Sequence, residues 1–288
     1  MNFVAKFQRN FEKISTQAVW LVGFRPFFIL GLLSGAVLPP LWFLVLMGYI
    51  KISPSISLLQ WHAHEMFFGF GWAVLGGFLL TSTKNWVRIR GYHGPILIIL
   101  TIFWLFDRLV FFFPPEFPTP FLLFFFQNAF VFSLIPLLIW TLTKYRKTDA
   151  YSDNWLFILS LPLFLISKIF ILKAGSFDLG WMMTIGLFRL ALLIMLERTL
   201  TQFIKATFQT HLFRNKWLDG TIKIAAFIGV FAFALPSFIS STLFAFIGSL
   251  LLIRFFLWSP RLGFQRLDIG IMYYGYLGLV FHFFLESS

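Results

Sequence analysis

The sequence predicts an all-α protein, a polytopic membrane helix bundle of about nine transmembrane helices with its N-terminus in the cytoplasm. Three observations predict it. Of the 288 residues, 59% are hydrophobic and 12% are charged, which is about half the charged fraction of a soluble domain. The apolar residues fall into segments of about 20 residues, the length that crosses a bilayer as a helix. The charged residues gather in the short connections between these segments.

Nine apolar segments are candidates for spanning helices. The seventh and eighth meet at residues 236–241, which begin with a proline, so the two are either a tight helical hairpin or one broken element. The nine candidates cover residues 23–47, 58–82, 95–113, 119–142, 155–173, 179–197, 221–236, 238–257 and 267–285.

Lysine and arginine predict the orientation, because short cytoplasmic loops carry an excess of both. One set of alternate connections holds almost no basic residue apart from Lys51 and Lys173. The alternation places the N-terminus in the cytoplasm and the C-terminus outside. The basic connections contain Lys6, Arg9, Lys13, Lys84, Arg88, Arg90, Lys144, Arg146, Lys147, Arg198, Lys205, Arg214, Lys216, Lys223, Arg254, Arg261 and Arg266.

The N-terminal segment differs from the rest of the chain. In residues 1–18, Phe3, Phe7 and Phe11 recur at helical spacing with basic residues between them. This pattern is typical of a cytoplasmic amphipathic helix on the membrane surface; a frayed basic tail is the alternative. Residues 19–288 are predicted to form a single transmembrane domain, because no polar stretch is long enough to fold alone.

Composition also limits the partners and the cofactor ligands. The net charge is +12, yet a nucleic-acid partner is excluded because the basic residues are spread over short loops rather than one continuous face. The lipid bilayer is the predicted partner. The absence of cysteine excludes disulfides, thiolate metal sites and iron–sulfur clusters. Any metal or haem must therefore be held by His, Met, Tyr or a carboxylate.

Residues 61–66, WHAHEM, are the first candidate site. Ionisable groups at membrane depth are costly, and each one is a functional hypothesis. On a regular helix His62 and Glu65 share a face, so the carboxylate is expected to orient that imidazole. His64 points to nearly the opposite side. One helix therefore cannot offer both imidazoles to one metal without a local distortion.

Polar residues of other segments are expected in the same outer half of the bundle. Each also has a structural alternative: snorkelling for the two cations of this half, helix–helix hydrogen bonding for the amides, and a wet interface for the histidine. Arg189, near the middle of the sixth segment, and Arg25, at the cytoplasmic start of the first, complete the candidates. The residues of the outer half are Asp107, Arg108, Gln127, Asn128, Lys168 and His282.

Three stretches, GFRPFF, WHAHEMFFGF and GGFLLTSTKNW, resemble the NnrS family, of which this chain would be a short member. The resemblance implies a haem- and copper-containing protein of the bacterial cytoplasmic (inner) membrane that takes part in the response to nitric oxide stress. It implies no enzyme class. His62, His64 and Glu65 match the family's histidine motif and would hold the metal, and Arg25 matches its first arginine.

Haem held by two histidines would need His62 or His64 together with His282, or two subunits, and a homo-oligomer or a membrane partner chain would supply the second subunit. Two other functions stay open. The converging polar groups also suit a transporter or channel for a small polar solute or a proton. Alternatively, they hold the helices of a membrane assembly partner together.

Overall fold

The computed structural model describes residues 12–51, 56–111 and 120–288. Within these ranges every regular element is a helix, and no strand occurs. The predicted all-α class is therefore confirmed. The chain divides into two compact parts, Met1–Phe177 and Asp178–Ser288, called unit 1 and unit 2 below. Each unit is described by itself.

The central element of unit 1 is one long helix, which consists of three consecutive segments. Leu58–His64 (α3) passes into a π-helical stretch, Glu65–Gly71 (η2), and then into Trp72–Trp86 (α4). Ser57 starts this helix with a capping box: its hydroxyl accepts from the Gln60 N–H at 3.2 Å, and its own N–H donates to Gln60 Oε1 at 2.9 Å.

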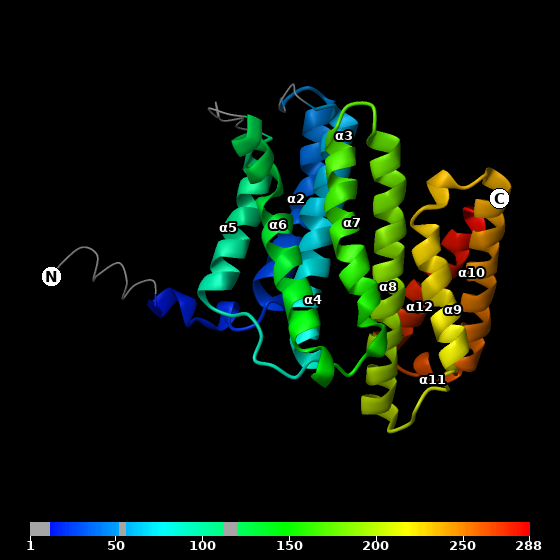
Figure 1. Ribbon diagram of the computed structural model, residues 1–288. Coiled ribbons are helices and arrows are strands. Elements are labelled where there is room, and N and C mark those ends of the chain that lie inside the picture. Colours follow the sequence, from blue (N-terminus) through cyan, green and yellow to red (C-terminus); the bar gives the residue numbers. More distant parts are fainter. Residues whose placement is uncertain (1–11, 52–55, 112–119) are drawn as a thin grey trace. The chain divides into compact units, whose positions relative to one another are not determined.

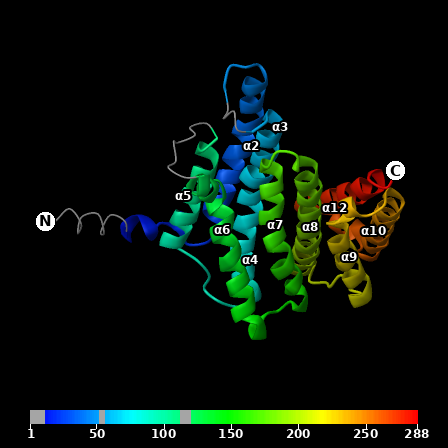
Figure 2. The ribbon, with the colours of Figure 1, turned by 45° about the horizontal axis from the view of Figure 1, so that its top comes forward.

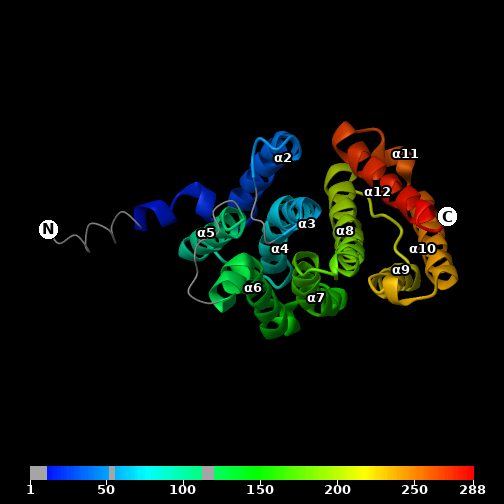
Figure 3. The same cartoon turned by 90° about the horizontal axis from the view of Figure 1, so that it is seen from above.

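Four further helices of unit 1 lie around this long helix, which contacts each of them. Figure 3 shows the arrangement from above, with α4 in the middle of unit 1, and in Figures 1 and 2 α6 and α7 run side by side. The four are Phe24–Leu46 (α2), Pro95–Leu109 (α5), Pro120–Lys144 (α6) and Trp155–Leu172 (α7).

Small residues allow α2 to approach the central helix closely. A Cβ atom added to Gly77 would lie 2.7 Å from Phe27 Cβ, and one added to Gly31 would lie 2.9 Å from Val74 Cγ2. Such distances leave no room for a side chain. The glycines therefore serve helix packing here, as small residues commonly do between membrane helices.

Unit 2 contains Phe177–Phe208 (α8), most of which belongs to it, Lys216–Gly229 (α9), Ser237–Leu257 (α10), Pro260–Gly263 (α11) and Leu267–Leu285 (α12). Helix α10 packs against both α9 and α12, which lie beside it in Figures 1 and 2. A short 3-10 turn, Ala232–Ala234 (η5), joins α9 to α10. The two predicted segments on either side of Pro236 are therefore separate, packed helices rather than one broken element.

Seven helical stretches are long and apolar enough to cross a membrane, among the residues that the structure describes. Two predicted spans fall short. Helices α5 and α9 have 15 and 14 residues, or about 22 and 21 Å at 1.5 Å per residue, against about 30 Å of hydrocarbon. The seven are Phe24–Leu46, Leu58–Trp86, Phe121–Lys144, Ser152–Leu172, Phe177–Phe208, Ser237–Leu257 and Leu267–Leu285.

The count of nine spans and the cytoplasmic N-terminus thus stay predictions. Most of the predicted N-terminal amphipathic segment, residues 1–11, lies outside the described residues. The prediction of one transmembrane domain over residues 19–288 likewise stays a prediction.

Candidate functional site

Five ionisable side chains are buried together at one end of unit 1, where α3 begins and α5 and α7 end. They come from four elements, α3, η2, α5 and α7. Three of them have no exposed surface, and the other two are 3% and 9% exposed. These residues, called the His64 network below, are His64, Glu65, Asp107, Arg108 and Lys168.

Asp107 lies at the centre of the His64 network. Its Oδ2 atom accepts from Lys168 Nζ at 2.7 Å and from Arg108 Nη2 at 2.8 Å. Its Oδ1 atom lies 3.6 Å from His64 Nε2 and makes no hydrogen bond to a described residue. Lys168 also donates to the backbone carbonyl of Gln127 at 2.6 Å. One carboxylate thus ties α5 to α7, and Lys168 ties both to α6.

Glu65 pairs with His64, not with His62 as expected from regular helix geometry. Glu65 Oε1 lies 2.9 Å from His64 Nδ1 and 3.1 Å from Arg108 Nε. The His62 ring instead stacks on Trp42, with the centroids 4.2 Å apart and the planes at 25°. The π-helical stretch that begins at Glu65 departs from the regular spacing on which the expected pairing rested.

Side chains of α5 bind backbone carbonyls of the π-helical stretch. Arg108 Nη1 donates to the Phe68 carbonyl at 2.7 Å, and Trp104 Nε1 donates to the Gly69 carbonyl at 3.1 Å. The Arg108 guanidinium also lies over the Trp104 ring, 5.3 Å from its centroid. Side-chain donors that satisfy an irregular turn are what allow such a turn at membrane depth.

The His64 network is electrically balanced. It contains two carboxylates and two cations, so its net charge is zero while the imidazole is neutral. Burying an unpaired charge costs several kcal/mol, and here each charge has an opposite partner within 3.1 Å. An imidazole beside two carboxylates from different helices can accept, hold or pass a proton. The network is therefore suited to proton handling or to polar binding inside an apolar shell.

An apolar groove lies beside the network between α2 and α5. It has a volume of about 260 Å³, and Glu65 and Arg108 supply its two charged lining groups. Other lining residues, among them Leu33, Val37 and Leu105, are 54%, 54% and 42% exposed on the helix surfaces. The groove thus connects the apolar surface of unit 1 with the buried charges.

The amides and the remaining basic candidates have separate placements. Asn128 donates to the Phe124 carbonyl of its own helix at 2.8 Å, and Gln127 enters the network only through its backbone oxygen. Arg25 donates to the Ala18 carbonyl at 2.6 Å, within the N-terminal part of unit 1. Arg189 and His282 belong to unit 2, where Arg189 Nε donates to His282 Nε2 at 2.8 Å.

The residues predicted to bind metal do not form one ligand set. Both nitrogens of His64 face charged groups, and His62 is stacked away from them on Trp42. In the described ranges no group of three or more His, Asp or Glu side chains could hold a metal ion. Copper bound jointly by His62, His64 and Glu65 does not fit this geometry.

A second buried ion network, which we had not predicted, lies in unit 2. Glu197 is 1% exposed; it accepts from Arg214, from Lys223 at 2.8 Å, and pairs with Arg254 at 3.4 Å. Arg254 Nε donates to the Tyr276 hydroxyl at 2.9 Å. With Asp219, 3.5 Å from Arg254, these six residues are called the Glu197 network below.

The sequence contained one signal for the Glu197 network. Glu197 is an acidic residue within an apolar segment, and it precedes an arginine counted as a loop charge. Three basic residues that the sequence assigns to the loops are in fact buried: Arg198, Lys223 and Arg254, which are 2%, 6% and 1% exposed. They lie inside α8, α9 and α10, so the number of basic residues in the loops is smaller than the sequence predicts.

Comparison with known proteins assigns the family. The family model described as NnrS protein matches residues 18–287, nearly the whole chain. No curated protein and no solved structure matches it.

Proposed function

The chain belongs to the NnrS family, and on that premise we propose that it acts in the response to nitric oxide stress in the cytoplasmic membrane of a bacterium. The spanning helices support a multi-pass membrane protein. The His64 network is its proposed functional centre. The observation that carries the proposal is that the WHAHEM segment, which bears the family resemblance, runs from α3 into the π-helical stretch Glu65–Gly71 and supplies His64 and Glu65 to that network.

The groove between α2 and α5 supports this assignment. Nitric oxide is small and uncharged, so it dissolves in the hydrocarbon of a bilayer as well as in water. A groove of about 260 Å³ with exposed aliphatic walls suits such a molecule. Its charged lining groups, Glu65 and Arg108, belong to the His64 network. The proposed route therefore runs from the bilayer between α2 and α5 to the network.

Haem and copper are implied by the family resemblance, and we propose His62 as the residue of the motif that ligates either. Its ring nitrogens make no hydrogen bond to any residue in the described ranges, whereas both nitrogens of His64 are engaged. The stacking of its ring on Trp42 would fix the direction of the ligating nitrogen. His62→Ala should abolish the Soret band or the copper content of the purified protein, and His64→Ala should not. Equal spectra and metal content for His62→Ala and wild type would overturn this assignment.

The nitric oxide proposal is tested in a bacterial host that lacks its own NnrS protein. Wild-type protein should shorten the growth lag after exposure to a nitric oxide donor. The double variant Asp107→Asn/Lys168→Gln removes one charge of each sign, which keeps the buried charge balanced. At matched membrane levels it should give no more protection than an empty vector.

Asp268→Asn is the matched control. Asp268 pairs with Arg266 on the surface of unit 2, where both side chains are more than half exposed. This variant should protect as wild type does. If the wild type gives no protection, or the double variant protects fully, the proposal fails.

A further inference from the structure

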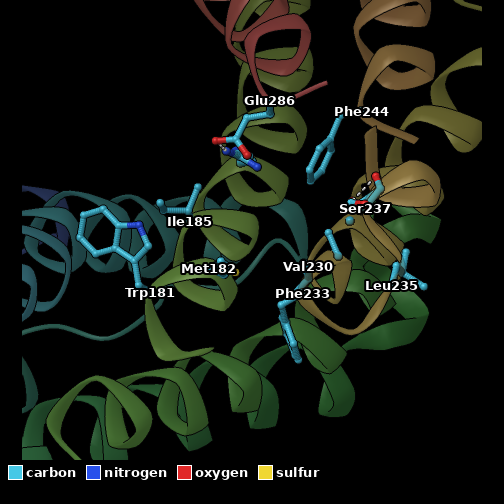
Figure 4. A pocket seen from close by; sticks show the side chains of 13 residues that line it. Trp181, Met182, Ile185, Val230, Phe233, Leu235, Ser237, Phe244 and Glu286 are labelled. Atoms are coloured by element: carbon cyan, nitrogen blue, oxygen red, sulfur yellow. Dashed lines mark hydrogen bonds and ion pairs between the residues drawn. The ribbon is translucent and has the colours of Figure 1, made fainter. Parts of the chain in front are cut away.

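Unit 2 contains a second site that the nitric oxide proposal does not use. A pocket of about 420 Å³ lies between α8, the end of α9, the start of α10 and the C-terminal end of α12. Figure 4 shows Glu286 and Phe244 at its upper end and Val230 and Phe233 below them. Most of its lining side chains are apolar, and Arg189 is the cation among them. Its volume lies in the range of small-molecule sites.

The guanidinium of Arg189 is held on several sides. The residue is 7% exposed, and its Nε donates to His282 Nε2 at 2.8 Å. The guanidinium carbon lies 5.4 and 5.6 Å from the ring centroids of Phe244 and Phe283. These contacts come from α10 and α12 and leave the Nη edge for an acceptor. A guanidinium fixed in this way is pre-organised for a carboxylate or phosphate, which it binds with two parallel hydrogen bonds.

One carboxylate of the chain already occupies that edge. Glu286 Oε1 lies 2.7 Å from Arg189 Nη2, and the Glu286 side chain is 39% exposed. Nη1 has no hydrogen-bond partner among the residues that the structure describes. Glu286 therefore occupies the position of an acidic ligand group but pairs with only one of the two terminal nitrogens of the guanidinium. Because its side chain is partly exposed, it can change rotamer and leave Arg189.

The start of α10 adds donors to the same pocket. Ser237 and Ser240 line it, and α10 begins at Ser237 without a side-chain cap or an acidic residue in its first turn. The first N–H groups of a helix have no partner within the helix and attract negative charge. Arg189 and the start of α10 thus both offer donors to the pocket, whereas Ile185, Val230 and Phe233 line it with apolar groups.

We propose that this pocket binds an amphipathic anion: an acidic head group, carboxylate or phosphate, that replaces Glu286 on Arg189, joined to an apolar body that packs on the walls. A bilayer supplies such molecules as fatty acids and anionic phospholipids. This site is separate in chemistry from the His64 network, and its failure would leave the nitric oxide proposal intact.

Binding is measured with the purified full chain in a neutral detergent, by native mass spectrometry and calorimetry. The probes are dodecanoate, a short-chain phosphatidylglycerol, inorganic phosphate and, as the neutral match, dodecanol. Dodecanoate or the phospholipid should bind, and dodecanol should not. Preference between the two acids identifies a fatty acid or a phospholipid as the source. Binding of phosphate alone, or of dodecanol as strongly as dodecanoate, would overturn the proposal.

Variants of the pocket distinguish a specific loss of binding from a loss of folding. Glu286→Gln removes the internal competitor and should tighten binding about tenfold, the effect of one charge-assisted hydrogen bond. Arg189→Gln should abolish binding, and Arg189→Lys, which keeps the charge without the fork, should weaken it. The control is Arg266→Gln, an exposed arginine of the same unit, which should bind as wild type does. Unchanged or weaker binding by Glu286→Gln contradicts the proposal.

Discussion

The two units each bury an ion network, but the networks differ in composition. The His64 network has two carboxylates, two cations and an imidazole, and it borders an apolar groove. The Glu197 network joins two carboxylates to three cations and contains no histidine. Arg254 there also lies over the rings of Trp258 and Tyr276, at 4.6 and 5.4 Å from their centroids.

The difference indicates different roles. The His64 network contains an imidazole, a side chain that can take up a proton, 2.9 Å from one carboxylate and 3.6 Å from another, and ionisable groups at membrane depth mark functional sites. The Glu197 network has one cation more than it has carboxylates. Its cations, Arg214 before α9, Lys223 in α9 and Arg254 in the last turn of α10, all pair with Glu197 of α8 and so hold these helices together. Cations near helix C-termini are also favoured by the helix dipole. We expect substitutions in the Glu197 network to affect stability, and substitutions in the His64 network to affect function as well.

The largest effect is expected for Glu197→Gln. The change keeps the size of the side chain but removes the carboxylate that pairs with Arg214, Lys223 and Arg254. Breaking a buried pair in this way costs about 3–5 kcal/mol. The free energy of unfolding, measured in mixed micelles with a denaturing detergent, should fall by that amount.

The same variant sharpens the comparison between the networks. Expressed to the wild-type level, Glu197→Gln should still protect cells against nitric oxide. A stable Glu197→Gln protein that gives no protection would mean that the Glu197 network is functional, and the contrast between the units would be wrong.

An intermediate effect is expected for the Asp107–Lys168 pair. In the wild type Lys168 Nζ lies 2.7 Å from Asp107 Oδ2, so Asp107→Asn alone leaves this buried ammonium without its carboxylate partner. Asp107→Asn/Lys168→Gln instead keeps the numbers of buried positive and negative charges equal. The double variant should therefore be more stable than the sum of the single changes predicts. A double-mutant cycle should give a coupling of about 1–3 kcal/mol. Strict additivity would show that the two side chains do not interact.

A smaller effect is expected for Gly69→Ala. A Cβ atom at this position would lie 3.0 Å from both Arg108 Nη1 and Glu65 Oε2, so the network would have to shift, at a cost of about 1 kcal/mol. Gly278→Ala is the matched control, because nothing lies within 4 Å of its added Cβ atom. Its melting temperature should not fall. If both alanines have the same effect, the close approach at Gly69 has no energetic consequence.

Much of the fold followed from local properties of the chain. Each of the nine predicted segments contains a helix, because the hydropathy and length of a segment do not depend on what it packs against. The predicted segments 95–113 and 221–236 extend past the last residues of α5 and α9, Leu109 and Gly229, because their hydrophobic runs continue beyond these residues.

The sequence predicted which residues lie in the His64 network, but not which of their side chains contact one another. Asp107, Arg108 and Lys168 were expected to lie in one half of the bundle, and they meet in the His64 network. The partner of Glu65 was mistaken, because the π-helical turn departs from the regular spacing on which the pairing depends. Gln127 contributes its carbonyl rather than its side chain, which no residue pattern reveals.

Residue types and their order along the chain thus determined the membrane class, the family resemblance and the candidate polar residues. Only the tertiary structure decided which of them meet. Asp107 and Lys168 are 61 positions apart, and Arg189 and His282 are 93 apart. Such contacts depend on the rotation of each helix about its axis, and a shift of one residue turns a side chain by about 100°. That rotation is set by packing between helices and not by the hydropathy of any one of them.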